Sequence, residues 1–250
     1  MSFTIRPIAT MRSDFPEKFG IPRQAGIVPE LESVVVFEPE YRDPEALRGI
    51  GGFSHLWLIW QFSESLTETF SPTVRPPRLG GNTRMGVFAT RSPFRPNGLG
   101  LSCVELARIE ERPGLGTVLV VRGADLMDGT PIFDIKPYVP YADCRPEASS
   151  GFAPDAGETL AVSIPDALLP KIPADRLPAL RGVLANDPRP RYQNDPERVY
   201  AMSFAGLTVR FTVENGTVQV REILSSRQDE KKEWGAHCAG SVLRTKDTEA

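Results

Sequence analysis

The chain of 250 residues has few of the side chains that build metal centres or disulfide frameworks. Its three cysteines, Cys103, Cys144 and Cys238, are odd in number, far apart and without a Cys-x-x-Cys spacing. Such a set predicts neither a disulfide framework nor a zinc site. Only two histidines are present, His55 and His237, so a histidine-rich metal centre is not expected either.

Long apolar runs are also missing from the sequence. No segment approaches the roughly 20 apolar residues that a membrane-spanning helix needs. The first residues, MSFTIRPIATMRSDF, contain no apolar core of the length found in signal peptides. These absences predict a cytoplasmic protein with no membrane association.

One stretch lacks acidic residues and lysine altogether. Between Glu68 and Glu105 there is no Asp, Glu or Lys, although the whole chain has a formal net charge of -3. The cations of this stretch are all arginines, whose planar guanidinium binds phosphate or carboxylate bidentately and stacks on flat rings. Prolines and glycines around them stiffen the turns and allow close backbone approach. The stretch therefore favours an anionic, flat ligand such as a nucleotide or RNA over a merely solvated loop. Its arginines are Arg75, Arg78, Arg84, Arg91 and Arg95.

The 24 prolines and 21 glycines predict many short strands and turns rather than long helices. Periodicity predicts one convincing helix, which starts at Asp175 or Arg176 and ends at Ala185. Asn215-Gly216 is the strongest hairpin signal. The segment 53–62 is expected to be a buried strand with His55 as a packed core histidine. Strands are expected at 3–9, 33–37, 53–62, 85–90, 101–110, 117–122, 132–135, 160–164, 199–205, 207–213 and 217–224.

The predicted fold class is mostly β. We expect a small β-barrel-like domain over residues 1–145, a small α+β domain over 146–224 and a flexible tail over 225–250. The segment PGLG at 113–116 is a hairpin turn and not a dinucleotide-binding fingerprint, because the third glycine and the following helix are missing.

The segment VRPPRLGGNTRMGVFATRSPFRPN at 74–97 resembles the central block of the TsaA-like family, also called TrmO. Four further blocks resemble family blocks in the same order: PRQAG at 22–26, FSHLW at 53–57, DLMDGTPIFDIKPYVPYAD at 125–143 and LANDPRP at 184–190. The resemblance spans roughly residues 3–224 and does not reach the tail.

The resemblance implies an S-adenosylmethionine (SAM)-dependent tRNA methyltransferase. Members of this family methylate N6 of threonylcarbamoyl-adenosine beside the anticodon of threonine tRNA. Their small β-barrel differs from the Rossmann fold of most methyltransferases, and they are homodimers with the cofactor site close to the subunit interface. SAM is the expected cofactor, and the tRNA anticodon loop and a second copy are the expected partners.

Cofactor contacts are carried over position by position from the family blocks. Many relatives have a His-Gln-like pair where this chain has Ser63-Glu64, so only backbone contacts are expected to survive there. The expected cofactor-binding residues are Arg23, Gln24, Ala25, Ser63, Glu64, Arg91, Leu101, Asp125, Leu126, Met127 and Asp128.

The acceptor nitrogen is attached to a carbonyl, so a protein group must accept its proton before or during transfer. The candidate catalytic residues are Asp125, Asp128, Asp134 and Tyr138, although Asp128 alternatively caps the turn at Gly129. The tRNA-binding candidates are Arg75, Arg78, Arg84, Arg95, Lys136, Arg189 and Arg191. Stacking surfaces are expected from Phe94, Tyr138 and Tyr192.

Three alternatives stay open. A SAM- or nucleotide-binding sensor would bind the donor and transfer nothing. A plain RNA-binding module would bind tRNA with a steep salt dependence and ignore SAM, but the overall acidic charge argues against it. A methyltransferase with a different acceptor would keep the enzyme class and change the substrate.

Overall fold

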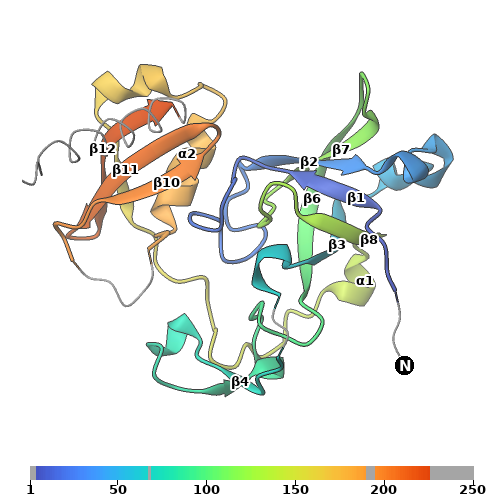
Figure 1. Cartoon of the computed structure of the whole chain (residues 1–250), viewed down its shortest axis with the longest axis horizontal. Coiled ribbons are helices and arrows are strands. Elements are labelled where there is room, and N and C mark those ends of the chain that lie inside the picture. The colour runs from blue at the N-terminus through green and yellow to red at the C-terminus, as the bar shows by residue number, and fades with distance from the viewer. Residues whose placement is uncertain (1–3, 67–68, 190–194, 226–250) are drawn as a thin grey trace, which may run out of the picture.

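The computed structural model describes residues 4–66, 69–189 and 195–225. Two sheets dominate it, a six-stranded barrel-like sheet and a four-stranded C-terminal sheet, and they form separate lobes (Figure 1). A third, smaller lobe holds a two-stranded sheet. The prediction of a mostly β fold is confirmed.

The barrel-like sheet closes through the order β1-β2-β7-β6-β3-β8. All its neighbouring pairs are antiparallel, and the closing pair of β1 with β8 joins only two residues on each strand. Its strands are β1 (Ala9–Arg12), β2 (Glu32–Phe37), β3 (His55–Gln61), β6 (Leu99–Arg112), β7 (Gly116–Arg122) and β8 (Pro131–Pro137). Alternate side chains point inward and fill the core, which includes Leu56, Leu58, Val104, Leu119, Val121 and Ile132.

The C-terminal sheet has the order β10-β11-β12-β9, with β9 parallel to β12. Its strands are β9 (Ala161–Ser163), β10 (Tyr200–Phe204), β11 (Leu207–Glu214) and β12 (Thr217–Ser225). Helix α2 (Leu177–Ala185) contributes Leu180, Val183 and Leu184 to the core of this lobe. Asn215 and Gly216 join β11 to β12 with φ of 48° and 72°, the left-handed backbone that this hairpin turn requires.

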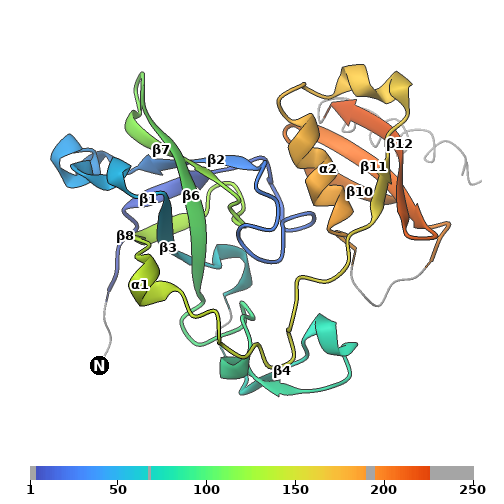
Figure 2. The ribbon, with the colours of Figure 1, turned by 180° about the vertical axis from the view of Figure 1, so that it is seen from behind.

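The loop over residues 13–31 connects β1 to β2 and joins the two large lobes. Phe15, Val28 and Leu31 of this loop are buried in the core of the C-terminal lobe. The Phe15 ring meets the Phe204 ring edge-on, with 5.4 Å between centroids. Both views show the loop reaching from the barrel towards the C-terminal sheet (Figures 1 and 2). The C-terminal core therefore draws on residues outside 146–224, and the predicted domain limits stay a prediction.

The remaining elements are short. The two-stranded sheet pairs β4 (Thr73–Val74) with β5 (Met85–Gly86), and α1 (Pro140–Asp143) follows β8. Among the described residues no helix is long and apolar enough to cross a membrane. The 3-10 helices are η1 (Pro39–Tyr41), η2 (Pro44–Leu47), η3 (Ile50–Gly52), η4 (Ser63–Ser65), η5 (Pro77–Leu79), η6 (Val87–Ala89) and η7 (Asp166–Lys171).

Three local predictions are wrong. The first strand lies at Ala9–Arg12 rather than 3–9, since Pro7 has no N–H to donate to a ladder. Of the segment 85–90 only Met85–Gly86 is a strand, because η6 follows and Thr90 bonds the Val87 carbonyl through both its N–H and its hydroxyl. His55 is exposed and bonds the Ser54 hydroxyl rather than packing in the core.

The other predicted strands and the helix are confirmed, within about two residues at most ends. β3 is buried on its inward side only. Leu56, Leu58 and Trp60 are buried, whereas Trp57 and Ile59 are half-exposed. The apolar run 53–62 therefore does not become a strand covered on both faces, because the barrel has a single layer and nothing in the described chain covers the whole outer side.

An ion-pair network on the barrel makes one prediction of pH-dependent stability. Arg108 donates to both carboxylate oxygens of Glu32 at 2.9 and 3.0 Å, and Arg122 donates to Oε1 at 3.0 and 3.2 Å. Burial opposes the charge on Glu32, but these hydrogen bonds outweigh it and lower the pKa of Glu32 below its ordinary 4.5. We expect Glu32→Gln to lose about 1 kcal/mol of unfolding free energy at pH 7.

The sign of the pH dependence follows from the lowered pKa. The stabilisation is fully present above the ordinary pKa of 4.5 and is lost as the pH falls through the lower folded-state pKa. Urea unfolding of both proteins at pH 7 and in acid checks this, and Glu45→Gln, which removes an exposed ion pair with Arg48, is the control. A difference between Glu32→Gln and the parent protein that persists unchanged in acid would contradict the role of the charge.

Candidate functional site

Three segments that are far apart in the sequence meet where the 13–31 loop lies on the barrel. The Gly26 N–H donates to the Gly123 carbonyl at 2.8 Å. A Cβ on Gly123 would lie 3.1 Å from the Gly26 backbone, so the two segments approach this closely because residue 123 is glycine. Arg91 of the arginine-rich segment donates to the Gln24 side-chain oxygen. We call this meeting of residues 23–26, Arg91 and Asp125 the loop junction.

Asp125 is the half-buried carboxylate of the loop junction. Its Oδ1 accepts a 2.5 Å hydrogen bond from the Ser102 hydroxyl, and it also accepts from the Ala25 backbone. Burial raises the pKa of Asp125, while the hydrogen bonds from Ser102 and the backbone and the charge of Arg91 oppose that rise. A carboxylate with a raised pKa beside one cation is typical of a functional site.

Trp60 and Gly100 position the Ser102 side chain. The Trp60 Nε1 donates to the Ser102 hydroxyl at 2.9 Å, which leaves the Ser102 proton for Asp125. A Cβ on Gly100 would lie 2.3 Å from the Trp60 ring, so only glycine lets the indole lie across β6 in this place. Gly100, Trp60 and Ser102 thus form one chain of contacts that orients Asp125.

The 13–31 loop is braced at two further points. Arg23 donates to the carbonyls of Asp187 and Arg189 in the C-terminal lobe, at 3.4 and 3.2 Å. Lys18 donates to the Glu64 carbonyl and, at 2.9 Å, to the Ser65 hydroxyl. Residues 63–65, which include the Ser63-Glu64 pair of the expected cofactor site, are therefore joined to the loop through a carbonyl and a neighbouring hydroxyl.

Several predicted site residues lie on the outer side of the barrel, away from Asp125. Ser102 is 2% exposed and points inward, whereas its neighbour Leu101 is 57% exposed and points outward. Leu101 pairs with Ile59, which pairs in turn with Asp134 of β8. Asp134 makes an ion pair with Lys136 at 3.0 Å. Asp134, Lys136 and Leu101 thus share the outer face.

The remaining predicted residues of this region have other contacts. The Tyr138 ring packs 5.8 Å from Trp57, and desolvation and the neighbouring Cys144 raise the pKa of Tyr138. Asp128 accepts from the Ser13 N–H at 3.1 Å and lies 3.6 Å from Arg12, so it ties the loop to the barrel. Leu126 is buried in the barrel core. The Met127 carbonyl accepts from Thr130.

The arginines of the 72–97 stretch are spread over the smallest lobe and the segment leading from it. Arg84 donates to the Thr73 hydroxyl at 2.8 Å, and Arg78 lies 3.7 Å from Asp155 of the segment that joins the large lobes. Arg95 donates to the Thr90 carbonyl at 3.1 Å, and Arg75 is exposed. In both views this lobe projects from the barrel beside the connecting segment (Figures 1 and 2).

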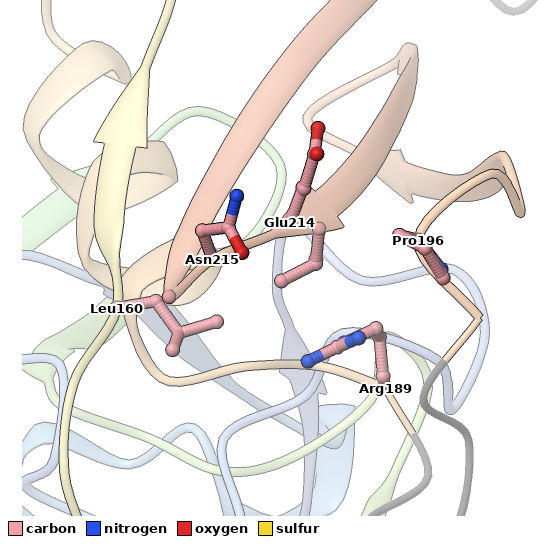
Figure 3. Close-up of a pocket in the computed structure, with 7 residues that line it drawn as sticks. Leu160, Arg189, Pro196, Glu214 and Asn215 are labelled. Carbon is pink, nitrogen blue, oxygen red and sulfur yellow. The ribbon is translucent and has the colours of Figure 1, made fainter.

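The C-terminal lobe has a cavity of about 420 Å³. The Arg189 side chain points into it (Figure 3), but its guanidinium is paired with the Asp187 carboxylate at 2.8 and 3.0 Å. Because this cation is already neutralised, the cavity offers an anion less than the loop junction does. Arg191 and Tyr192 lie outside the described residues. The cavity is lined by Leu160, Arg189, Pro196, Val213, Glu214, Asn215 and Gly216.

The sequence interpretation missed Ser102, Trp60 and Lys18. Ser102 had a readable signal, because it is a polar residue at an inward position of an alternating strand, between Gly100 and Val104. Lys18 had none, since its contact with residues 64–65 depends on where the loop lies. Within the described ranges no group of three or more His, Cys, Asp or Glu side chains is placed to hold a metal ion.

Comparison with known proteins gives a consistent result over nearly the whole chain. The family model for the tRNA-methyltransferase O N-terminal domain matches residues 10–144, and that for the TrmO C-terminal domain matches 167–226. A tRNA (adenine(37)-N6)-methyltransferase of Escherichia coli is 41% identical over 228 residues, covering 88% of this chain and 97% of that protein.

Two further similarities agree with this one. A tRNA (adenine(37)-N6)-methyltransferase of Eikenella corrodens is 46% identical over 177 residues, 69% of this chain and 98% of that protein. The crystal structure of TrmO from Pseudomonas aeruginosa superposes with a TM-score of 0.74 at 32% identity, covering 90% of this chain and 99% of that one. The chain therefore belongs to the tRNA-methyltransferase O family.

Proposed function

We propose that this protein transfers a methyl group from SAM to N6 of threonylcarbamoyl-adenosine at position 37 of threonine tRNA. Family membership and the relatives named tRNA (adenine(37)-N6)-methyltransferase support the reaction. Similar proteins of Pseudomonas aeruginosa are named putative S-adenosylmethionine-dependent methyltransferases. The observation that carries the proposal is the loop junction, where Arg91, the 23–26 backbone and a half-buried carboxylate meet.

The residues of the loop junction fit a zwitterionic nucleoside such as SAM. Arg91 offers a cation for a carboxylate, and its bond to Gln24 fixes its direction. Asp125 offers an acceptor for hydroxyl or ammonium hydrogens, and the open space beside Gly26 lets a ligand approach the backbone there. SAM would supply an electrophilic methyl group on a sulfonium, so the protein has mainly to align the reactants and exclude water. The proposed cofactor contacts remain Arg23, Gln24, Ala25, Ser63, Glu64, Arg91, Leu101, Asp125, Leu126, Met127 and Asp128.

We place the role of proton acceptor first on Asp125. Its raised pKa moves it towards the range in which a carboxylate is an effective base. The Asp128 carboxylate makes an ion pair with Arg12 at 3.6 Å, and Asp134 makes one with Lys136 on the outer face. The raised pKa of Tyr138 keeps its hydroxyl protonated, so less of the phenolate that could accept a proton is present.

For the tRNA we propose contacts through the projecting lobe and the C-terminal lobe. Arginine and lysine side chains at these places would neutralise phosphates and position the anticodon loop. Arg189, being paired with Asp187, is the weakest of them. The proposed tRNA-binding residues are Arg75, Arg78, Arg84, Arg95, Lys136, Arg189 and Arg191.

We also propose that the protein is a homodimer that works in the cytoplasm, where its tRNA substrate is found. The outer face of the barrel supports the dimer, because Trp57, Ile59 and Leu101 lie there on adjacent strands and are half-exposed or exposed. Sedimentation velocity of the protein and of a Leu101→Glu variant tests this assembly. A monomer in both cases would overturn it.

The test of the function is methyl transfer from labelled SAM to bulk tRNA, followed by mass analysis of the nucleosides. Transfer only to the threonylcarbamoyl-adenosine, and none to tRNA lacking the threonylcarbamoyl group, is the expected result. SAM binding without transfer to any tRNA would favour a sensor. Binding of tRNA without SAM would favour an RNA-binding module, and methyl gain on another nucleoside would favour a different acceptor.

A further inference from the structure

Two phenylalanines lie exposed side by side at the base of the small lobe. Phe70 is 56% exposed and Phe88 is 73% exposed, and their rings stack with 6.3 Å between centroids and an interplanar angle of 24°. Val87, the neighbour of Phe88, is 1% exposed. The chain thus buries the smaller apolar side chain and presents the aromatic ring to solvent.

The pair is held by the short β4–β5 ladder. Thr73 pairs with Gly86, and the Val87 N–H donates to the Pro72 carbonyl at 3.0 Å. These bonds bring the chain before β4 next to the chain after β5, which sets Phe70 beside Phe88. The aromatic pair is therefore fixed by backbone hydrogen bonds on both strands.

The segment that carries the pair has positive charges only. Every formal charge between residues 69 and 104 is an arginine. Arg84 reaches back to the Thr73 hydroxyl on the same ladder, and Arg75 is exposed on the following turn. Flat apolar rings beside arginines match a polyanion that also carries flat faces, which is the description of an unpaired RNA segment.

The aromatic pair is close in the chain to the loop junction. Phe88 precedes Arg91 by three residues, so their Cα atoms are at most about 10 Å apart. The turn between them is stiff, because Thr90 bonds the Val87 carbonyl at 2.8 Å through its hydroxyl and accepts from the Ser92 N–H at 3.2 Å. An RNA base stacked on the phenylalanine rings would therefore lie within a few nucleotides of a base bound near Arg91.

We propose that Phe70 and Phe88 form a stacking platform for an unpaired base of the substrate RNA, next to the nucleotide that enters the loop junction. This inference rests on the proposed function for the identity of the RNA. The platform binds any base through its face, so it contributes affinity and position rather than sequence selectivity. Arg75 and Arg84, which flank the ladder, hold the adjoining phosphates.

The test compares Phe88→Ala and Phe70→Ala with the parent protein in tRNA binding and in methyl transfer. We expect about a ten- to hundredfold weaker tRNA affinity, in line with the loss of one stacked base. SAM affinity by calorimetry should be unchanged. The fold-loss of tRNA affinity should be the same at every salt concentration, because no charge is removed. Arg84→Ala, in contrast, should reduce the slope of log affinity against log salt concentration by about one.

Two controls make the test decisive. Phe88→Tyr keeps a flat ring and should keep tRNA affinity, and Ile109→Ala removes an exposed apolar side chain from β6. Unchanged tRNA affinity in both alanine variants would overturn the platform. The alanine variants could instead lose the dimer in sedimentation, with a fall in tRNA affinity no larger than the loss of the dimer accounts for. That result would make the pair a subunit contact and would also overturn the platform.

The outcomes also separate the platform from the proposed function. A parent protein that methylates no tRNA but binds it through Phe88 would refute the function and keep the platform. A parent protein that methylates threonine tRNA with unchanged KM in both alanine variants would keep the function and refute the platform.

Discussion

Asp125→Asn is expected to lower the rate of methyl transfer by about 10²- to 10⁴-fold, the usual contribution of a positioned general base. Asparagine is nearly the same size and can still accept the hydrogen bond from Ser102, so the fold should be retained. Single-turnover transfer at saturating SAM and tRNA measures the loss directly. A variant with near-parental turnover would remove Asp125 from the chemistry.

The same variant should be at least as stable as the parent protein at neutral pH, although its activity is lower. The pKa of Asp125 is raised in the folded protein above its ordinary 3.8, chiefly by burial. Its contribution to stability is therefore present below pH 3.8 and is lost as the pH rises through the raised value. At pH 7 the uncharged asparagine should leave the unfolding temperature equal or higher. Asp43→Asn, at the cap of η2, is the control for an unrelated carboxylate.

Ser102→Ala separates positioning from chemistry. The hydrogen bond from Ser102 lowers the pKa of Asp125, so its removal should raise that pKa further. The rise of activity with pH should then shift to higher pH, and turnover at neutral pH should fall less than in Asp125→Asn. A pH profile identical to that of the parent protein would show that Ser102 acts only in packing.

Phe15→Ala is expected to cost about 3–5 kcal/mol of unfolding free energy, as for other phenylalanines removed from cores. Phe15 is 1% exposed and packs on Phe204 in the C-terminal core. Its carbonyl accepts from the Asp128 N–H at 2.8 Å on the barrel side. Phe15 thus contacts both large lobes. Its carbonyl bonds the barrel side, and its ring packs in the core of the C-terminal lobe.

The functional consequence of Phe15→Ala should be a weaker binding of SAM. The 13–31 loop carries Arg23 and Gln24 as well as Phe15, and freeing it from the C-terminal core would disorder the loop junction. Urea unfolding and calorimetric titration of SAM measure the two effects. Phe53→Ala, which removes a 40% exposed ring, is the matched control. Parental stability and SAM affinity together would contradict the coupling.

The parts of the fold that follow local rules could be predicted from the sequence. Asn215-Gly216 has the backbone freedom that the β11–β12 turn needs, and the spacing of Leu180, Val183 and Leu184 produces the buried face of α2. The error at residues 3–9 came from reading alternation across Pro7. The error at 85–90 came from a segment whose conformation depends on bonds made by Thr90.

The candidate site could be predicted only in pieces. Gln24, Arg91 and Asp125 were each expected to bind the cofactor, but nothing local says that Arg91 bonds Gln24 or that Asp125 lies beside the 23–26 loop. Asp134 and Tyr138 are near Asp125 in sequence and were grouped with it. Strand β8 pairs Asp134 with Ile59 on the outer face and leads to Tyr138, which packs on Trp57, whereas Asp125 lies in the loop before this strand.

The sequence by itself determined the fold class, the family and the residue types of the site. These follow from composition, short-range periodicity and blocks of neighbouring residues, all of which are local along the chain. Only the tertiary structure decided which charged groups meet, that Trp60 and Ser102 orient Asp125, that Phe15 joins the lobes and that Phe70 lies on Phe88. Those contacts join residues far apart in the chain. They are determined by closure of the barrel and by packing between the lobes, and not by the conformational preference of any single segment.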